Sequence, residues 1–165
     1  MIRVIGIDPG TINMGYGIVD EEDGELKLVA CGVISLLSKI PIENRLHAFY
    51  LKINKIISEF QPDEAAVEEP FVSTNVRSAF AIGRAQAIVI LAAAESKIPI
   101  CRYMPSEIKL QVTNNGHSSK EQVIEMVKLQ LKQEKPLKSS DAADALAIAI
   151  CHINNRHIKN LINNY

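Results

Sequence analysis

Residues 3–18, RVIGIDPGTINMGYGI, decide how the rest of the chain is arranged. The largely apolar run at residues 4–7 predicts a short buried strand, and Asp8 follows it immediately before the chain-breaking pair Pro9-Gly10. Residues 15–18 then predict the return strand of a hairpin. A carboxylate at the end of a buried strand is costly unless it is paired, hydrogen-bonded or bound to a cation. Asp8 is therefore a candidate site residue, the alternative being an aspartate that only opens a turn.

Length and composition are those of one globular domain. The chain has 165 residues, 47% of them hydrophobic, which predicts a single domain over residues 1–165 with a sizeable core. The longest apolar run, residues 87–94, is too short to cross a membrane, and the sequence after Met1 has no signal-peptide pattern. The three cysteines are widely spaced and form no metal-binding motif. We therefore expect a cytoplasmic protein with reduced thiols.

The charge balance gives a weak indication of a nucleic-acid partner. The net charge of -1 does not by itself predict nucleic-acid binding. However, residues 102–165 carry nine Lys and Arg against six Asp and Glu, whereas residues 1–101 carry nine against thirteen. The C-terminal part could give one face a potential that attracts phosphate, although a mixed solvated surface has the same composition.

The hydrophobic pattern along the chain predicts an α/β fold. After the first hairpin, strands are predicted at Leu26–Ser35, Glu64–Glu68 and Ile98–Met104. Helices are predicted at Ile42–Phe60, at Ala79–Ser96, from Glu107, from a Ser118/Glu121 capping box to Lys132, and from Asp141 after a Ser139 or Ser140 cap. Because a helix precedes the fourth strand, that strand should run parallel to the first. The expected fold is a five-stranded mixed sheet, an antiparallel meander plus two parallel strands, flanked by helices.

Four carboxylates are predicted to meet at one edge of this sheet. Asp8 and Glu68 end two adjacent parallel strands, whose carboxyl ends lie at the same edge. Asp141 and Asp144 lie in the first turn of the last helix, with Cβ atoms roughly 5–6 Å apart on one face. That pair alone could equally be an N-terminal capping arrangement. Together the four acids would repel one another unless divalent cations neutralised them, and oxygen ligands favour Mg²⁺ or Mn²⁺ over Zn²⁺.

The motifs also resemble a known family. GIDPG at residues 6–10, GYG at 15–17, VEEPF at 67–71 and DAADALAIAI at 141–150 occur in the order found in the RuvC family of Holliday-junction resolvases. The resemblance runs over nearly the whole chain, and its closing block is the most specific part. GIDPG alone is shared by many RNase H-like and actin-like proteins. The resemblance implies an RNase H-like fold and a homodimeric nuclease.

The resemblance also assigns catalytic residues. Asp8, Glu68, Asp141 and Asp144 stand where the family keeps its catalytic, metal-binding carboxylates. Glu69 competes with Glu68 for the strand position. Strand alternation puts the two glutamates on opposite faces, and Glu68 stands at the family's position, so we assign the metal to Glu68.

Candidate DNA-binding residues follow from the same comparison of motifs. Phe71 occupies the position of a hydrophobic or aromatic residue that reaches into the junction, and Lys109 and Lys120 match basic residues near the scissile phosphate. Taken singly, the two lysines would be ordinary solvated side chains. Asn75 and Arg77 belong to a polar segment after Phe71 and are further candidate phosphate contacts.

The expected function is resolution of four-way (Holliday) DNA junctions by symmetric, divalent-metal-dependent nicking of two strands in homologous recombination and DNA repair. Two Mg²⁺ ions, or Mn²⁺, per active site would activate water and stabilise the leaving oxygen. The resemblance alone suggests a branch-migration partner of the RuvA and RuvB type. The alternatives are an RNase H-like nuclease for structured RNA, of the pre-rRNA processing type, and a non-catalytic junction-binding protein. An actin-like ATPase would need two such domains.

Overall fold

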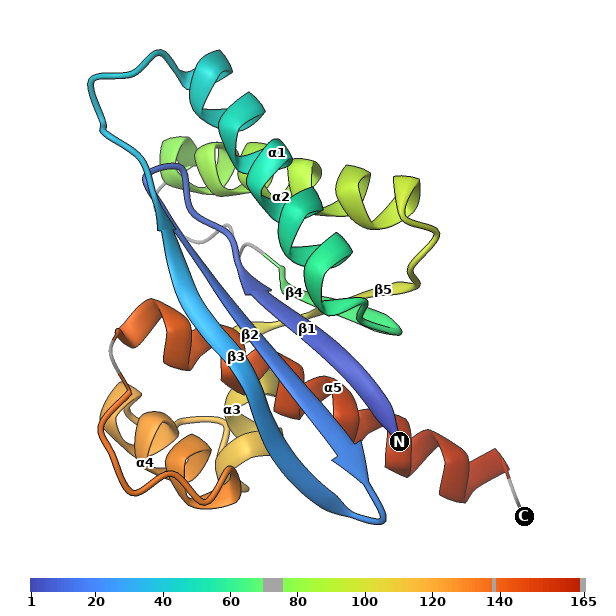
Figure 1. Ribbon diagram of the computed structural model, residues 1–165. Helices are drawn as coiled ribbons and strands as arrows, with labels where there is room; N and C mark the ends of the chain where they lie inside the picture. The colour runs from blue at the N-terminus through green and yellow to red at the C-terminus, as the bar shows by residue number, and fades with distance from the viewer. Residues whose placement is uncertain (70–75, 138, 164–165) are drawn as a thin grey trace.

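Five strands form one mixed sheet in the computed structural model, which describes residues 1–69, 76–137 and 139–163 (Figure 1). The strands are β1 (Ile2–Asp8), β2 (Asn13–Glu22), β3 (Glu25–Ser35), β4 (Glu64–Glu68) and β5 (Ile100–Tyr103), in the order β3-β2-β1-β4-β5. Strands β1 to β3 are antiparallel neighbours, whereas β4 pairs in parallel with β1, and β5 in parallel with β4. The predicted sheet is confirmed.

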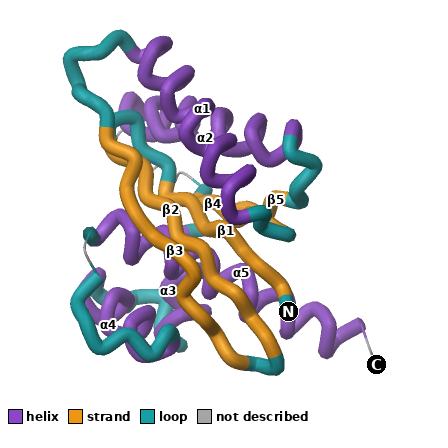
Figure 2. The backbone as a smooth tube through the Cα atoms, viewed as in Figure 1, coloured by secondary structure: helices purple, strands orange, loops and turns teal. Residues whose placement is uncertain are grey.

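Helices cover both faces of the sheet. The helices α1 (Ile42–Phe60) and α2 (Val76–Glu95) lie on one face, and α3 (Pro105–Thr113), α4 (Lys120–Gln130) and α5 (Ser140–Asn163) lie on the other (Figures 1 and 2). Alternate residues of β1 point to the two faces of the sheet and pack against the helices on each face. Ile5 and Ile7 pack in the cluster that contains Phe49 of α1, while Val4 packs in the cluster that contains Leu146 of α5.

Helix α5 lies unusually close to the strands because glycines face it. A Cβ atom on Gly6 would lie 2.1 Å from the backbone oxygen of Ala145, and one on Gly15 would lie 2.1 Å from that of Asp141. No side chain fits at these positions, so the backbones of β1 and β2 touch the helix directly. This contact holds the first turn of α5 over the ends of β1 and β2.

Several predicted boundaries differ from those observed. Strand β5 is shorter than predicted, because the amide of Ile98 closes the end of α2 on the Ala93 carbonyl and Pro99 has no N–H. Met104 is the N-cap of α3, which begins at Pro105 rather than at Glu107. Helix α2 begins at Val76, three residues before the predicted start.

The predicted capping box of α4 is wrong by one residue. Ser119 is the N-cap, its hydroxyl accepts from the Gln122 amide at 3.3 Å, and its own amide donates to the Gln122 side chain at 2.8 Å. Ser118 is buried instead, and its hydroxyl bonds that of Thr113 at 2.7 Å. Two adjacent serines, each three residues before a Glu or Gln, fit the same sequence pattern, and burial decides between them.

Candidate active site

Two parallel strands bring Asp8 and Glu68 to one edge of the sheet. The register pairs Ile7 with Val67, so the next residues, Asp8 and Glu68, end β1 and β4 side by side. Alternation places both carboxylates on the same face as Gly6, which contacts α5. The site therefore forms where the carboxyl ends of two strands meet the first turn of a helix.

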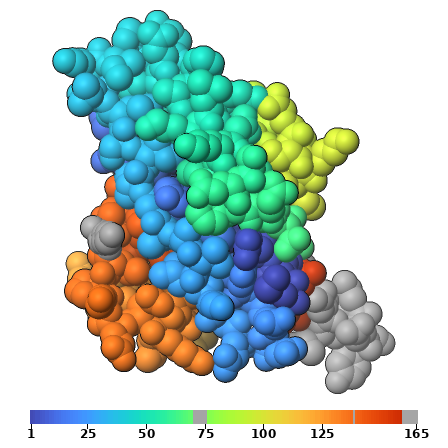
Figure 3. Space-filling model, viewed as in Figure 1, coloured from blue at the N-terminus to red at the C-terminus, as the bar shows by residue number. Residues whose placement is uncertain are grey.

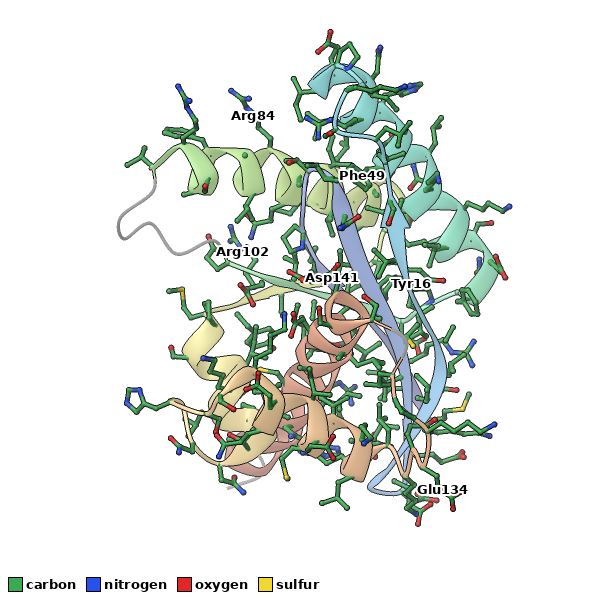
Figure 4. The ribbon with its side chains drawn as sticks, turned by 90° about the vertical axis from the view of Figure 1, so that its left-hand side faces the viewer. Tyr16, Phe49, Arg84, Arg102, Glu134 and Asp141 are labelled. Atoms are coloured by element: carbon green, nitrogen blue, oxygen red, sulfur yellow. The ribbon has the colours of Figure 1, made fainter. Side chains whose placement is uncertain are left out.

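Helix α5 adds Asp141 and Asp144 at this edge, but only Asp141 lies in the first turn, because the helix begins at Ser140 rather than at the predicted Asp141. One carboxylate oxygen from each of Asp8, Asp141 and Asp144 can be chosen so that all three lie within 4.8 Å of one another. The Ser139 hydroxyl accepts from the Asp141 amide at 3.2 Å, which identifies Ser139 as the helix cap. Figure 4 shows Asp141 at the start of α5, close to the strand ends. Three of the four predicted acids thus lie within metal-binding distance of one another.

Glu68 lies beside this group, but its carboxylate oxygens are not within 4.8 Å of all three of the others. Burial raises the pKa of Glu68, and the negative charge of Asp144 raises it further, so the carboxylate does share the field of the cluster. Its backbone carbonyl accepts a hydrogen bond from the Gln86 side chain at 3.0 Å. Gln86 is buried in α2 and ties that helix to the end of β4. Sequence reasoning missed Gln86, although a single amide in an Ala-rich helix is a signal of such a role.

The electrostatics of the site are those of acids without enough cations. Burial and then the charges of Glu68, Asp144 and Asp141, in that order, together raise the pKa of Asp8 from 3.8 to about 7. The charge of Lys120 acts in the opposite direction and is too weak to restore the ordinary value. A buried carboxylate in this setting is stabilised in its charged form only by more positive charge nearby.

Lys109 and Lys120 approach the acids from α3 and from the start of α4. The Lys120 ammonium donates to Asp144 at 2.7 Å, and this hydrogen bond raises the pKa of the lysine. The positive charges of Lys109 and Lys120 both act to lower the pKa of Glu68. The structure therefore brings both lysines near the carboxylates, and their binding of DNA stays a prediction.

A hard divalent cation fits this donor set. The available ligand atoms are carboxylate oxygens, which suit Mg²⁺ or Mn²⁺ better than softer metals. The raised pKa of Asp8 marks an excess of negative charge that such an ion would remove. Asp8, Asp141 and Asp144 would hold the ion, and Glu68 lies near enough to share their field.

The remaining predicted DNA contacts are Phe71, Asn75 and Arg77. Phe71 and Asn75 lie outside the described residues. Arg77 is exposed in the first turn of α2.

Comparisons with known proteins give this site a context. The sequence profile of the family described as crossover junction endodeoxyribonuclease RuvC matches residues 4–152. A RuvC of Dehalococcoides mccartyi is 45% identical over 98% of this chain and 96% of its own length. A RuvC of Alkaliphilus metalliredigens is 40% identical, with 96% of each chain covered. The chain belongs to the RuvC family.

Solved structures agree with the family assignment. The RuvC of T. thermophilus in complex with a Holliday junction substrate superimposes with a TM-score of 0.91 at 30% identity, covering 96% of this chain and 97% of that one. The yeast mitochondrial Holliday junction resolvase Ydc2 superimposes with a TM-score of 0.64 at 18% identity, over 99% of this chain and 86% of that one. That second match shows a shared fold, which is the RNase H-like fold predicted from the motifs.

Proposed function

We infer that this chain is a crossover junction endodeoxyribonuclease that resolves four-way DNA junctions by nicking two strands symmetrically. The observation that carries this inference is the acid group of Asp8, Asp141 and Asp144 at the carboxyl edge of a RuvC-family sheet. A Holliday junction is the substrate in the complex of the T. thermophilus relative. No feature of the described residues favours the two alternatives, an RNA nuclease and a non-catalytic binding protein.

Asp8, Glu68, Asp141 and Asp144 are the proposed catalytic residues, and they would bind two Mg²⁺ ions, with Mn²⁺ as the alternative. When bound, such ions supply an activated water and stabilise the leaving oxygen. The protein positions the acids on two strand ends and at the start of one helix, so that they are fixed before DNA arrives. Lys120 and Lys109 add positive charge beside them, where the scissile phosphate would lie.

A homodimer is the proposed working form. Helix α2 exposes an apolar stripe at helical spacing, and its members are Val76, Phe80, Gly83, Ala87 and Leu91. Phe80 is 68% exposed, and a Cβ atom on Gly83 would meet no heavy atom within 4 Å. A patch of this kind usually marks an interface. A second copy meeting it about a two-fold axis would match the two-fold symmetry of a junction.

The composition of α2 raises one further possibility for this stripe. The helix is long and apolar enough to be a candidate membrane span, with 28% of its apolar window buried. Buried Gln86 and Val89, however, face the protein, and Arg84 is exposed among the apolar residues. We propose instead a cytoplasmic dimer, working with a branch-migration complex of the RuvA and RuvB type.

The decisive test uses a synthetic four-way junction beside a linear duplex of the same sequences, with Mg²⁺ and with EDTA. Paired nicks in opposite arms of the junction, in Mg²⁺ only, are expected. Cleavage of structured RNA in preference to the junction would favour the RNA-nuclease alternative. An intact junction that is nevertheless bound would favour the binding protein.

The dimer has a separate test. Phe80→Glu should convert the protein to a monomer in analytical ultracentrifugation, because it places a charge at the centre of the apolar stripe. Leu129→Glu is the matched control, since Leu129 is 71% exposed on α4, away from the stripe. A Phe80→Glu protein that sediments as a dimer would contradict the α2 interface.

A further inference from the structure

Arg102 is an exposed cation close to the acidic edge, which is the edge of the sheet where Asp8, Glu68 and the start of α5 meet. The proposed cleavage reaction does not use Arg102. In β5 the register pairs Arg102 with Val67, and pairs the following Tyr103 with Glu68. Neighbouring strands lie about 4.8 Å apart, so the Arg102 backbone is within one residue and one strand of the proposed metal ligand. The Arg102 side chain is 60% exposed. Figure 4 shows it between α2 and α3.

The side chain of Glu69, at the end of β4, lies beside that of Arg102. The Glu69 amide donates to the Tyr103 carbonyl at 2.8 Å, so the ladder between β4 and β5 continues one residue beyond Glu68. Because side chains alternate along a strand, Glu69 points to the face of the sheet opposite Glu68. Arg102 points to the same face as Glu69, since it pairs with Val67. The Glu69 carboxylate lies 3.7 Å from the Arg102 Nε atom. The two side chains therefore form a loose ion pair behind the acid group, and this pair is separate from that group.

The ion pair between Arg102 and Glu69 is weak enough for Arg102 to exchange Glu69 for another anion. Both side chains are solvent-exposed, at 60% and 38%, and the 3.7 Å separation is longer than that of a good hydrogen bond. An exposed pair of this kind contributes little to the stability of the folded chain. A guanidinium binds a phosphate through two parallel hydrogen bonds, which is a stronger interaction than this contact with Glu69.

The nearby lysines have other partners. Lys120 is hydrogen-bonded to Asp144, and Lys109 acts on Glu68, so both lysines partly neutralise the acid group itself. The ion-pair partner of Arg102 is Glu69, on the other face of the sheet. DNA continues on both sides of the scissile phosphate, and Arg102 lies at the end of β5 where a flanking phosphate can reach it.

We propose that Arg102 is a further phosphate-binding residue of the junction interface, and that Glu69 occupies it in the free protein as a built-in competitor. The proposal rests on the junction-binding function inferred above. Binding of DNA exchanges the Glu69 carboxylate for a phosphate that flanks the scissile one. The competitor lowers the affinity for DNA by the free energy needed to break the contact between Glu69 and Arg102.

The test measures the dissociation constant of a four-way junction in EDTA, where no cutting occurs, over a series of salt concentrations. Arg102→Gln should weaken binding by about fivefold and lower the slope of log K against log salt by about one for each phosphate that the variant no longer neutralises. Glu69→Gln should tighten binding when Arg102 is present. In the Arg102→Gln background that gain should largely disappear, because no cation is left to release.

The matched controls are Lys132→Gln and Glu25→Gln. This ion pair is also exposed, with a separation of 3.3 Å, and it lies at the other end of the sheet. The same changes of charge there should leave junction affinity and its salt slope unaltered. Equal losses from Arg102→Gln and Lys132→Gln would mean that only net charge matters, and would overturn the proposal.

Two further outcomes separate the parts of the proposal. Junction binding that Arg102→Gln leaves unchanged would overturn the phosphate contact while leaving the proposed function intact. An equal gain from Glu69→Gln in both backgrounds would overturn the role of Glu69 as a competitor for Arg102. Absence of junction binding by the wild-type protein would overturn the proposed function, and this inference with it.

Discussion

The two ends of the sheet are both acidic, but more of the acids form ion pairs at one end than at the other. At the end where β1 begins, several acids have basic partners: Asp20 with Arg3 at 2.7 Å, Glu64 with His152 at 2.6 Å and Arg156 at 3.1 Å, and Glu25 with Lys132 at 3.3 Å. At the end where β1 finishes, Asp8, Asp141 and Asp144 lie together with a single direct ion pair among the described residues, from Lys120 to Asp144.

The number of acids in a stretch therefore does not identify a site. The most acidic stretch in the sequence is residues 20–25, DEEDGE, which forms the tip of the β2–β3 hairpin. Figure 3 shows this hairpin beside the segment that follows α4, from which Lys132 reaches it. In that stretch Asp20 pairs with Arg3 and Glu25 pairs with Lys132, whereas burial and neighbouring acids raise the pKa of Asp8 to about 7. Unpaired charge is therefore the better indication of a site than charge alone.

The largest expected effect compares one aspartate from each end. Asp8→Asn should abolish junction cutting, by roughly two to three orders of magnitude or more, because it removes a proposed metal ligand. Asp8→Asn should not lower the free energy of unfolding in EDTA, because the substitution removes a buried carboxylate that has no cation bound to it. Asp20→Asn should do the opposite, leaving cutting intact and lowering the free energy of unfolding by about 1–3 kcal/mol through the loss of the Arg3 pair.

Single-turnover cleavage and chemical denaturation of the two variants provide the check. Junction binding measured in EDTA should survive in both proteins, which excludes misfolding as the cause of lost cutting. Cutting by Asp8→Asn at near the wild-type rate would remove Asp8 from the proposed metal site.

The second effect is a dependence of stability on pH that the acidic edge alone should produce. The folded protein holds the Asp8 proton up to a pKa of about 7, whereas the unfolded chain releases it near 3.8. Unfolding therefore releases a proton in this interval, and the free energy of unfolding falls as pH rises from about 4 to about 7, by up to about 4 kcal/mol. The pKa of Glu68 is also raised, so its contribution has the same sign.

Thermal unfolding at pH 5 and pH 8, in EDTA and in Mg²⁺, measures this dependence. The loss of stability in EDTA should be smaller in Asp8→Asn than in the wild-type protein. Mg²⁺ should reduce the wild-type loss, because a bound cation favours the ionised acids. Equal losses in the two proteins would mean that Asp8 does not titrate in this interval.

The contrast between the two ends also shows how much the sequence could predict. The strand ends at Asp8 and Glu68 and the helix start at Asp141 could be located from hydrophobic periodicity and chain-breaking residues, and their meeting followed from parallel pairing. The pairing state of each acid could not be predicted. Arg3 and Asp20 become partners through strand register, and Lys120 meets Asp144 only when α4 packs beside α5. Those contacts depend on the fold as a whole.

A third effect concerns the one direct cation at the acidic edge among the residues that the structure describes. Lys120→Met should lower cutting by about 10–100-fold, because positive charge near the scissile phosphate is lost while the acids remain. Lys132→Met, at the end where β1 begins, should leave cutting unchanged. Comparison of the two variants at saturating Mg²⁺ separates a role at the phosphate from a role in neutralising Asp144. Full recovery of Lys120→Met at high Mg²⁺ would favour the second role.

The smallest effect tests whether burial decides how much the ion pairs at the end where β1 begins contribute to the free energy of unfolding. Glu64 is 24% exposed and bonds His152, whose own Nδ1 atom bonds the Tyr103 hydroxyl at 2.8 Å. Glu64→Gln should lower the free energy of unfolding by about 1–2 kcal/mol, because a hydrogen-bonded, partly buried acid is replaced by a neutral amide. Glu25 is 76% exposed, so solvent screens its pair with Lys132, and Glu25→Gln should change stability little. Urea denaturation of both variants distinguishes the two cases, and equal destabilisation would show that pairing, rather than burial, governs this end of the sheet.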